Sequence, residues 1–261
     1  MKKPCHDTKS TALPILIPAR MKASRLPGKP LADIAGKPMI IHVWERAMAA
    51  DIGPVIVATD GEDIAAAIRA QGGIAVITDP DLPSGSDRIY EALCHIDPDG
   101  VYESVINLQG DLPEIDVTLL KMLADMLRQP AWDLVTLASE CSTEEAQLAQ
   151  IVKAVIAWQP EQRLGFAAGT ALYFSRAAIP DGPAPFWHHI GLYGWRRDAL
   201  ARFISLPPSP LELSEKLEQL RALEDGMSIG VGKADHAPGG IDTEADLMAC
   251  RARFEAATKT S

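Results

Sequence analysis

Short apolar runs alternate with amphipathic helical segments through the first half of the chain, and this alternation limits the folds it can adopt. Apolar runs bounded by Pro, Gly or polar residues are typical of buried strands, and apolar residues every three or four positions are typical of helices. Strands are expected at 13–17, 55–58, 74–78, 105–108 and 133–138, and helices at 39–50, 62–71, about 84–94 and 116–128. The alternation predicts an α/β fold, a Rossmann-like, mostly parallel sheet flanked by helices.

The pattern changes after residue 150. Three β segments, 151–158, 170–174 and 190–195, follow one another without helices, and the Pro- and Gly-rich stretch 179–185 joins the last two. They predict an antiparallel extension inserted into the sheet, suited to a lid or a dimer arm. Further helices are expected at 143–149, 198–204, 214–223 and 243–256, with a last strand around 229–231. We expect residues 1–12 to be a disordered tail and 13–261 to be one domain, with the insertion at about 151–196.

A basic loop follows the first predicted strand. It carries Arg20, Lys22, Arg25 and Lys29, although the whole chain is acidic, with 35 Asp plus Glu against 25 Lys plus Arg. Most clusters of charge are solvated surface, but a local reversal of sign favours a site for an anion. Gly28 allows close approach of the backbone to a ligand, and open parallel sheets bind nucleotides at the carboxyl ends of their strands. A polyphosphate is the expected anion.

Two further polar turns carry chemical groups. The segment 84–88, Ser-Gly-Ser-Asp-Arg, opens a helix that Ser84 or Ser86 can cap, which leaves Arg88 without a structural explanation. Asp111 follows the fourth strand and has two interpretations, a helix N-cap or a ligand of magnesium beside the phosphates. Asp116 is the better cap for the helix that follows, so we favour a metal ligand for Asp111.

Composition excludes several classes of protein. A net charge of −10 argues against nucleic acid as a partner, because phosphate-backbone binding needs an extended basic surface. Residues 1–12 do not resemble a signal peptide, and no segment approaches the roughly 18 apolar residues of a membrane helix, so a cytoplasmic protein without a membrane anchor is expected. The cysteines lack Cys-x-x-Cys spacing, which argues for reduced thiols and against structural zinc: Cys5, Cys94, Cys141 and Cys250.

A series of motifs in fixed order resembles the 3-deoxy-manno-octulosonate cytidylyltransferase family, the CMP-Kdo synthetases. The resemblance covers roughly residues 13–250, and several ordered motifs are far more specific than a single match. The motifs are Ile17-Pro18-Ala19-Arg20, Ser24-Arg25-Leu26-Pro27-Gly28-Lys29-Pro30, Val57-Ala58-Thr59-Asp60, Ser84-Gly85-Ser86-Asp87-Arg88, Gln109-Gly110-Asp111, Tyr173-Phe174-Ser175-Arg176, His189-Ile190-Gly191-Leu192-Tyr193, Pro208-Ser209-Pro210-Leu211-Glu212, Leu217-Glu218-Gln219-Leu220-Arg221 and Ile241-Asp242-Thr243.

The resemblance implies a fold of the nucleotide-diphospho-sugar transferase type, with an antiparallel dimerisation insertion, and a homodimer. It implies transfer of CMP from CTP to the 2-keto sugar acid Kdo, with Mg²⁺, for lipopolysaccharide biosynthesis. By its motifs, the implied catalytic residues are Lys29 and Arg20, the nucleotide-binding residues Ser24, Arg25, Ser84, Arg88 and Gln109, the metal ligands Asp111 and Asp242, and the sugar-binding residues Arg176, His189, Tyr193, Glu215 and Gln219.

The sequence departs from the family pattern at Leu112, where a Glu is common, and at Trp195, where a Tyr is usual. His189 is also readable as a strand-edge histidine, and Glu215 and Gln219, four residues apart, as one solvated helix face. One alternative function is therefore a cytidylyltransferase for another 2-keto sugar acid, 8-amino-Kdo or a sialic-acid-like sugar. A catalytically silent nucleotide-binding protein is the other, and it would require the loss of Lys29 or of a metal ligand.

Overall fold

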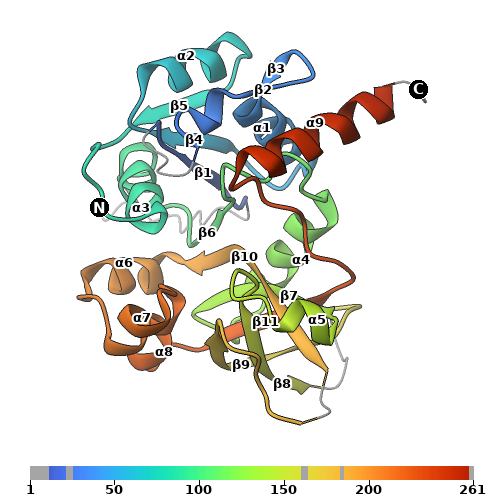
Figure 1. Ribbon diagram of the computed structural model, residues 1–261. Helices are drawn as coiled ribbons and strands as arrows, with labels where there is room; N and C mark the ends of the chain where they lie inside the picture. The colour runs from blue at the N-terminus through green and yellow to red at the C-terminus, as the bar shows by residue number, and fades with distance from the viewer. Residues whose placement is uncertain (1–11, 22–25, 160–163, 183–184, 259–261) are drawn as a thin grey trace, which may run out of the picture.

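The computed structural model describes residues 12–21, 26–159, 164–182 and 185–258. In this part of the chain, nine strands form one sheet in the order β5-β4-β1-β6-β10-β7-β11-β9-β8, and β2 and β3 form a hairpin (Figure 1). The strands are β1 (Ile15–Ala19), β2 (Asp33–Ile34), β3 (Lys37–Pro38), β4 (Val55–Thr59), β5 (Ile74–Ile77), β6 (Ser104–Asn107), β7 (Leu134–Cys141), β8 (Lys153–Gln159), β9 (Ala168–Ser175), β10 (Phe186–Arg196) and β11 (Ile229–Ala234).

The sheet is mixed, as the sequence predicts. Strands β5, β4, β1 and β6 are parallel, and β7 is parallel to β11. Between these two groups lies β10, which is antiparallel to both β6 and β7, and β8 and β9 pair antiparallel at the far edge. The carboxyl ends of β1 and β6 therefore meet at one edge of the sheet, where the sequence places the basic loop and Asp111.

Both faces of the sheet are covered, which explains the continuous apolar character of its first strand. Ile15 and Ile17 of β1 pack in one core cluster with α1 and α4, whereas Leu16 points into a second cluster with α3 and α6. The helices are α1 (Met39–Ala49), α2 (Glu62–Ala70), α3 (Gly85–Ile96), α4 (Val117–Leu127), α5 (Thr143–Ala146), α6 (Arg197–Ser205), α7 (Pro210–Glu215), α8 (Gln219–Glu224) and α9 (Glu244–Thr258), with a short 3-10 helix η1 (Lys29–Leu31).

Two sequence interpretations are wrong. The helix expected at 214–223 is two helices, because α7 ends at Glu215 and Lys216 adopts a left-handed conformation with φ of 56°. Glu215 and Gln219 therefore do not share one helix face. The interpretation of His189 as a residue at the edge of its strand also fails, since β10 begins at Phe186 and His189 lies inside it.

The last helix returns the chain to the first half of the fold. Figure 1 shows α9, in red, beside β2 and α1, and its Leu247 and Cys250 pack with Ile34 and Met39. This packing brings residue 241, also in that cluster, and its neighbour Asp242 to the loops that follow β1 and β6. Among the helices that the structure describes, none has the length and apolarity needed to cross a membrane.

Candidate active site

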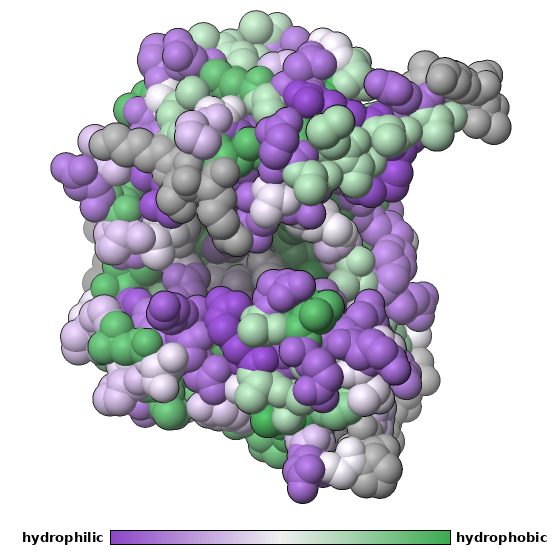
Figure 2. Space-filling view, viewed as in Figure 1, coloured by the Kyte–Doolittle hydropathy of each residue, from purple (hydrophilic) through white to green (hydrophobic). Residues whose placement is uncertain are grey.

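One pocket opens at the shared edge of β1 and β6, and Figure 2 shows the hollow between the two halves of the molecule. Its volume of about 290 Å³ is close to the lower end of the range for small-molecule sites, roughly 300 Å³. Its walls come from four segments far apart in the chain: Pro18, Ala19, Arg20, Leu26, Lys29 and Pro30, then Ser84, Gly85 and Arg88, then Gln109, Gly110 and Asp111, and finally Asp242.

Glycine is required where two of these segments touch. A Cβ atom on Gly110 would lie 2.8 Å from the carbonyl oxygen of Pro18, so any other residue would push the loop after β6 away from the end of β1. Gly28, with φ of 71°, precedes η1, and Pro30 lies in its first turn. These residues hold the backbone of Lys29 at the pocket wall.

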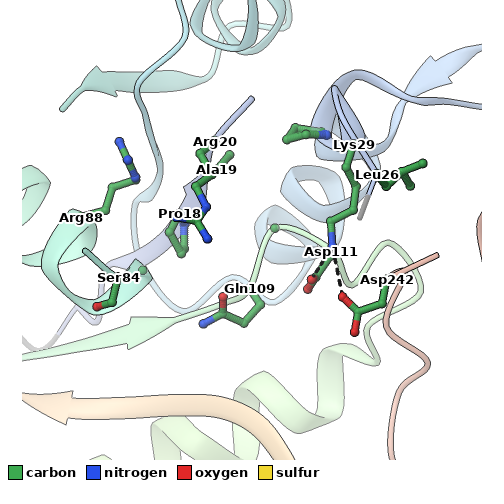
Figure 3. A pocket seen from close by; sticks show the side chains of 13 residues that line it. Pro18, Ala19, Arg20, Leu26, Lys29, Ser84, Arg88, Gln109, Asp111 and Asp242 are labelled. Carbon is green, nitrogen blue, oxygen red and sulfur yellow. Dashed lines mark hydrogen bonds and ion pairs between the residues drawn. The ribbon is translucent and has the colours of Figure 1, made fainter. Parts of the chain in front are cut away.

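Lys29, Asp111 and Asp242 converge on one point (Figure 3). The Lys29 ammonium donates to Asp111 Oδ2 at 2.8 Å and to the Ile241 carbonyl oxygen at 2.6 Å, and it lies 3.7 Å from Asp242 Oδ1. The Ile241 N–H also donates to the Asp111 carbonyl oxygen at 3.0 Å, which joins the two carboxylate-bearing loops through their backbones. The structure thus brings Lys29, one of the two implied catalytic residues, together with both implied metal ligands.

The oxygen atoms around this point suit a hard divalent cation. Carboxylate and carbonyl oxygens are the protein ligands that Mg²⁺ prefers, often only one or two carboxylates with phosphate oxygens completing the shell. Asp116 caps α4, accepting from Thr118 N at 2.8 Å, so Asp111 is not needed as that cap. Leu112 packs in the core, and the described residues contain no group of three His, Cys, Asp or Glu arranged for a metal. Asp111 and Asp242 are therefore the two carboxylates at this point that could hold such a cation.

Asp242 is held by the helix that follows it. Asp246, in the first turn of α9, accepts through Oδ2 from the N–H groups of Asp242 at 3.1 Å and Thr243 at 2.8 Å. The Thr243 hydroxyl in turn accepts from Asp246 N at 3.2 Å. This reciprocal capping arrangement orients the turn that presents Asp242 to the pocket.

The turn at the start of α3 lies at the other end of the pocket from Lys29 (Figure 3). Ser84 caps the helix, accepting from Ser86 N at 3.1 Å and Asp87 N at 3.2 Å. Arg88 is buried, donates to Thr78 Oγ1 at 2.5 Å and lies 3.8 Å from Asp60 Oδ2. Burial lowers the pKa of Arg88, and Asp60 opposes this effect.

Gln109 lines the pocket between Ser84 and Asp111 (Figure 3). Its Nε2 donates to Asn107 Oδ1 at 3.4 Å, a long contact that a ligand can replace. Arg20 also lines the pocket and is exposed. Ser24 and Arg25, which the sequence places in the same loop, lie outside the described residues.

His189 and Tyr193 of β10 are buried, with 6% exposure each. The Thr136 hydroxyl lies 2.9 Å from the Ile190 carbonyl oxygen and 2.7 Å from the Leu192 carbonyl oxygen, and its single proton is donated to these acceptors. His189 Nε2, at 3.0 Å from the same hydroxyl oxygen, is therefore the donor in the bond between the two side chains. Burial lowers the pKa of His189 to about 3 and raises that of Tyr193. Tyr193 pairs with Asn107 in the β10–β6 register, two residues before Gln109.

The remaining predicted sugar contacts fall into two groups. Arg176 and Glu215 bind each other: Glu215 Oε2 accepts from Arg176 N at 3.0 Å, and Arg176 Nε donates to the Glu215 carbonyl oxygen at 3.0 Å. Gln219 is separate from this pair and buried, and its Nε2 has no hydrogen-bond partner among the described residues. None of the five predicted sugar contacts lines the pocket that holds Lys29.

Two residues near the site were missed from sequence. Glu218 accepts from Ser86 Oγ at 2.7 Å, across 132 residues of chain, and burial raises its pKa. Asp60 accepts from Met21 N at 3.3 Å and faces Arg88, so it connects the basic loop to α3. Both lie within motifs that mark the family resemblance, but their contacts are long-range and no local pattern predicts them.

Known proteins share this architecture. A family model described as cytidylyltransferase matches residues 14–229. The 3-deoxy-manno-octulosonate cytidylyltransferase of Parvibaculum lavamentivorans is 54% identical over 91% of both chains, and that of Rhodopseudomonas palustris strain BisB18 is 56% identical over 91% of this chain and 95% of its own. A solved CMP:2-keto-3-deoxy-manno-octonic acid synthetase complexed with CTP superposes with a TM-score of 0.85 at 40% identity, covering 95% of this chain and 99% of its own. The chain therefore belongs to the 3-deoxy-manno-octulosonate cytidylyltransferase family.

Proposed function

We propose that the protein transfers CMP from CTP to Kdo, releasing pyrophosphate and forming CMP-Kdo for lipopolysaccharide biosynthesis. The observation that carries this proposal is the convergence of Lys29, Asp111 and Asp242 in a pocket that also contains Arg20. Nucleotidyl transfer needs positioned reactants and neutralised phosphate charge more than it needs covalent chemistry from the protein. Cations beside carboxylates at the carboxyl ends of parallel strands meet that need.

The reaction forms a bond between the anomeric oxygen of the sugar and the α-phosphorus of CTP and breaks the bond from that phosphorus to pyrophosphate. The anomeric hydroxyl gives up its proton, which passes to solvent water or to the released pyrophosphate. Asp111 and Asp242 would hold Mg²⁺, which supplies Lewis-acid stabilisation of phosphate charge when bound. Lys29 and Arg20 would neutralise the phosphate oxygens, and Ser84, Arg88 and Gln109 would surround the base and ribose, with Ser24 and Arg25 completing the loop.

We place the acceptor on the β10 side of the pocket, where Tyr193 is aligned with Asn107. Gln219 supports this placement, because a buried amide without a protein partner favours a polar ligand, and the hydroxyls of a sugar acid can supply one. His189 would orient the strand that carries Tyr193, through its bond to Thr136. Arg176 and Glu215 would hold the segments around the acceptor, since they already bind each other.

We infer that the protein acts in the cytoplasm as a homodimer. Free thiols at Cys94, Cys141 and Cys250 suit a reducing compartment. The family resemblance implies the dimer, with an interface in the 151–196 segment.

Pyrophosphate release from CTP tests the function. With Mg²⁺ present, we expect release with Kdo to exceed release with 8-amino-Kdo and with a sialic acid. Faster release with either alternative sugar would keep the cytidylyl transfer and overturn the choice of acceptor. Absence of release with every sugar acid would overturn the transfer itself.

A further inference from the structure

The Lys29 ammonium lies among the same oxygen atoms that would bind a divalent cation. It contacts Asp111 Oδ2 at 2.8 Å and the Ile241 carbonyl oxygen at 2.6 Å, with Asp242 Oδ1 at 3.7 Å. The Lys29 side chain is 14% exposed, against 32% for Asp111 and 51% for Asp242, so the ammonium is the most enclosed of the three groups. One positive charge is therefore built into the carboxylate pair.

Two positive charges at this point would repel each other. Charges about 4 Å apart at a protein surface interact strongly, because the local dielectric is well below that of water. A divalent cation approaching the two carboxylates would have to share them with the ammonium or displace it. Lys29 can move, because a lysine has a flexible four-carbon side chain and the 3-10 helix fixes only its backbone.

We propose that Lys29 competes with a divalent cation for Asp111 and Asp242 until a phosphate chain offers the ammonium another partner. This inference rests on the proposed function, which brings a triphosphate into the same pocket. Lys29 then couples the two ligands: the cation binds weakly by itself and well together with the nucleotide, because phosphate oxygens take over the ammonium. Lys29 therefore has two effects: it weakens binding of the cation when no nucleotide is present, and it neutralises phosphate charge when the nucleotide is bound.

The carboxylate pair does not depend on Lys29 for its assembly. The backbone bond from Ile241 N to the Asp111 carbonyl oxygen, at 3.0 Å, joins the two loops, and Asp246 holds the turn at Asp242. Replacing the lysine by an uncharged side chain of similar length should therefore leave both carboxylates in place. Removal of the Lys29 charge is then expected to strengthen binding of the cation. Loss of a metal-binding carboxylate would have the opposite effect.

Titration with Mn²⁺, followed by the electron paramagnetic resonance signal of the free ion and without CTP, tests this inference. We expect the Lys29→Met variant to bind Mn²⁺ at least about fivefold more tightly than the unaltered protein. Lys29→Arg keeps the charge and should show no such gain. The matched control for net charge is Lys37→Met, because Lys37 is exposed and pairs with Glu45 at 2.6 Å, outside the lining of the pocket.

Equal or weaker binding by Lys29→Met would overturn the proposal. So would an equal gain in Lys29→Arg, which would indicate a loosened loop, or in Lys37→Met, which would indicate a general effect of net charge. The double variant Lys29→Met with Asp111→Asn should lose the gain, and a retained gain would place the ion elsewhere and contradict the inference. The titration contains no nucleotide or sugar, so its failure is distinguishable from failure of pyrophosphate release.

Discussion

Asp111 has two structural connections, because its carboxylate accepts from Lys29 and its carbonyl oxygen accepts from Ile241. The backbone connection is independent of the charge, so the carboxylate can be neutralised without separating the loops. We expect Asp111→Asn and Asp242→Asn each to reduce pyrophosphate release by about 100-fold or more, with little change in melting temperature. Steady-state kinetics and thermal unfolding measure the two effects, and full activity in both variants would refute the assignment of two metal-binding carboxylates.

The buried side chain of His189 makes the stability of the folded protein depend on pH in acid. Its pKa is 6.5 in an unperturbed chain and about 3 in the folded protein, because burial disfavours the charged ring. Between these values the unfolded chain binds more protons, so this contribution is complete above pH 6.5 and is lost as the pH falls towards 3. The expected loss is about 1.4 kcal/mol for each pH unit in that window.

Urea unfolding of the protein and of His189→Gln at several pH values measures this contribution. The free energy of unfolding of the unaltered protein should fall more steeply below pH 6.5 than that of the variant, and other titrating groups cancel in the difference. If the free energy of unfolding changes with pH in the same way for both proteins, protonation of His189 does not destabilise the folded state.

The break between α7 and α8 illustrates what local pattern cannot reveal. The apolar and polar spacing at 214–223 suits one helix, yet Lys216 takes the left-handed conformation and its N–H donates to the Glu212 carbonyl oxygen. Arg221 binds Glu212 from the next helix, with Nε to Oε2 at 2.7 Å, which holds the two helices together across the break. A lysine carries no local signal for a positive φ, so only the tertiary contacts account for it.

Substitution at Lys216 distinguishes a break from a continuous helix. With a left-handed residue there, Lys216→Gly should leave the free energy of unfolding unchanged or raise it by up to about 1 kcal/mol, and Lys216→Val should lower it by about 1–2 kcal/mol. In a continuous helix, glycine would instead lower it by about 1 kcal/mol. Urea unfolding of the two variants decides, and a destabilising glycine would contradict the break.

Elements buried on both faces could be predicted closely from sequence, and contacts between distant residues could not. β1 and the first four residues of β4 are apolar because core clusters cover both sides of the sheet. Ser84 and Asp116 are caps whose partners lie within three residues. The polar residues after β1 and β6 indicated where the pocket lies, because the carboxyl ends of parallel strands meet at one edge of a sheet. Ser86 and Glu218 are 132 residues apart, and no periodicity connects them.

At the scale of the molecule, the pocket depends on the last part of the chain as much as on the first. Asp242 lies 131 residues beyond Asp111. It reaches the same pocket because α9 packs against β2 and α1 and because the Ile241 N–H binds the Asp111 carbonyl oxygen. Arg253 of α9 binds Glu114, with Nε to Oε1 at 2.9 Å, which adds a second attachment near the loop after β6. The final helix is thus part of the framework that brings the two carboxylates together.

Assembly of two copies is the remaining expectation at this scale. Leu172 of β9 is 60% exposed and lies within the 151–196 segment that the resemblance assigns to dimerisation. Twofold dimers are the commonest closed assemblies of soluble proteins. We expect Leu172→Glu to shift the protein towards a monomer in light scattering at dilute concentration. Met248→Glu is the matched control, because Met248 is 63% exposed on α9, outside that segment, and should leave the dimer intact.

His189 and Tyr193 lie in the same segment and connect the dimer to the acceptor side of the pocket. Their own chain already buries both, so a partner would act on the strands that carry them and not by covering the side chains. We expect both residues to lie close to the interface. We also expect the Leu172→Glu monomer to lose more affinity for the sugar acid than for CTP, because other segments form the pocket around Lys29. The Michaelis constants for the two substrates measure this difference. A fully active monomer would show that the acceptor side is complete within one chain.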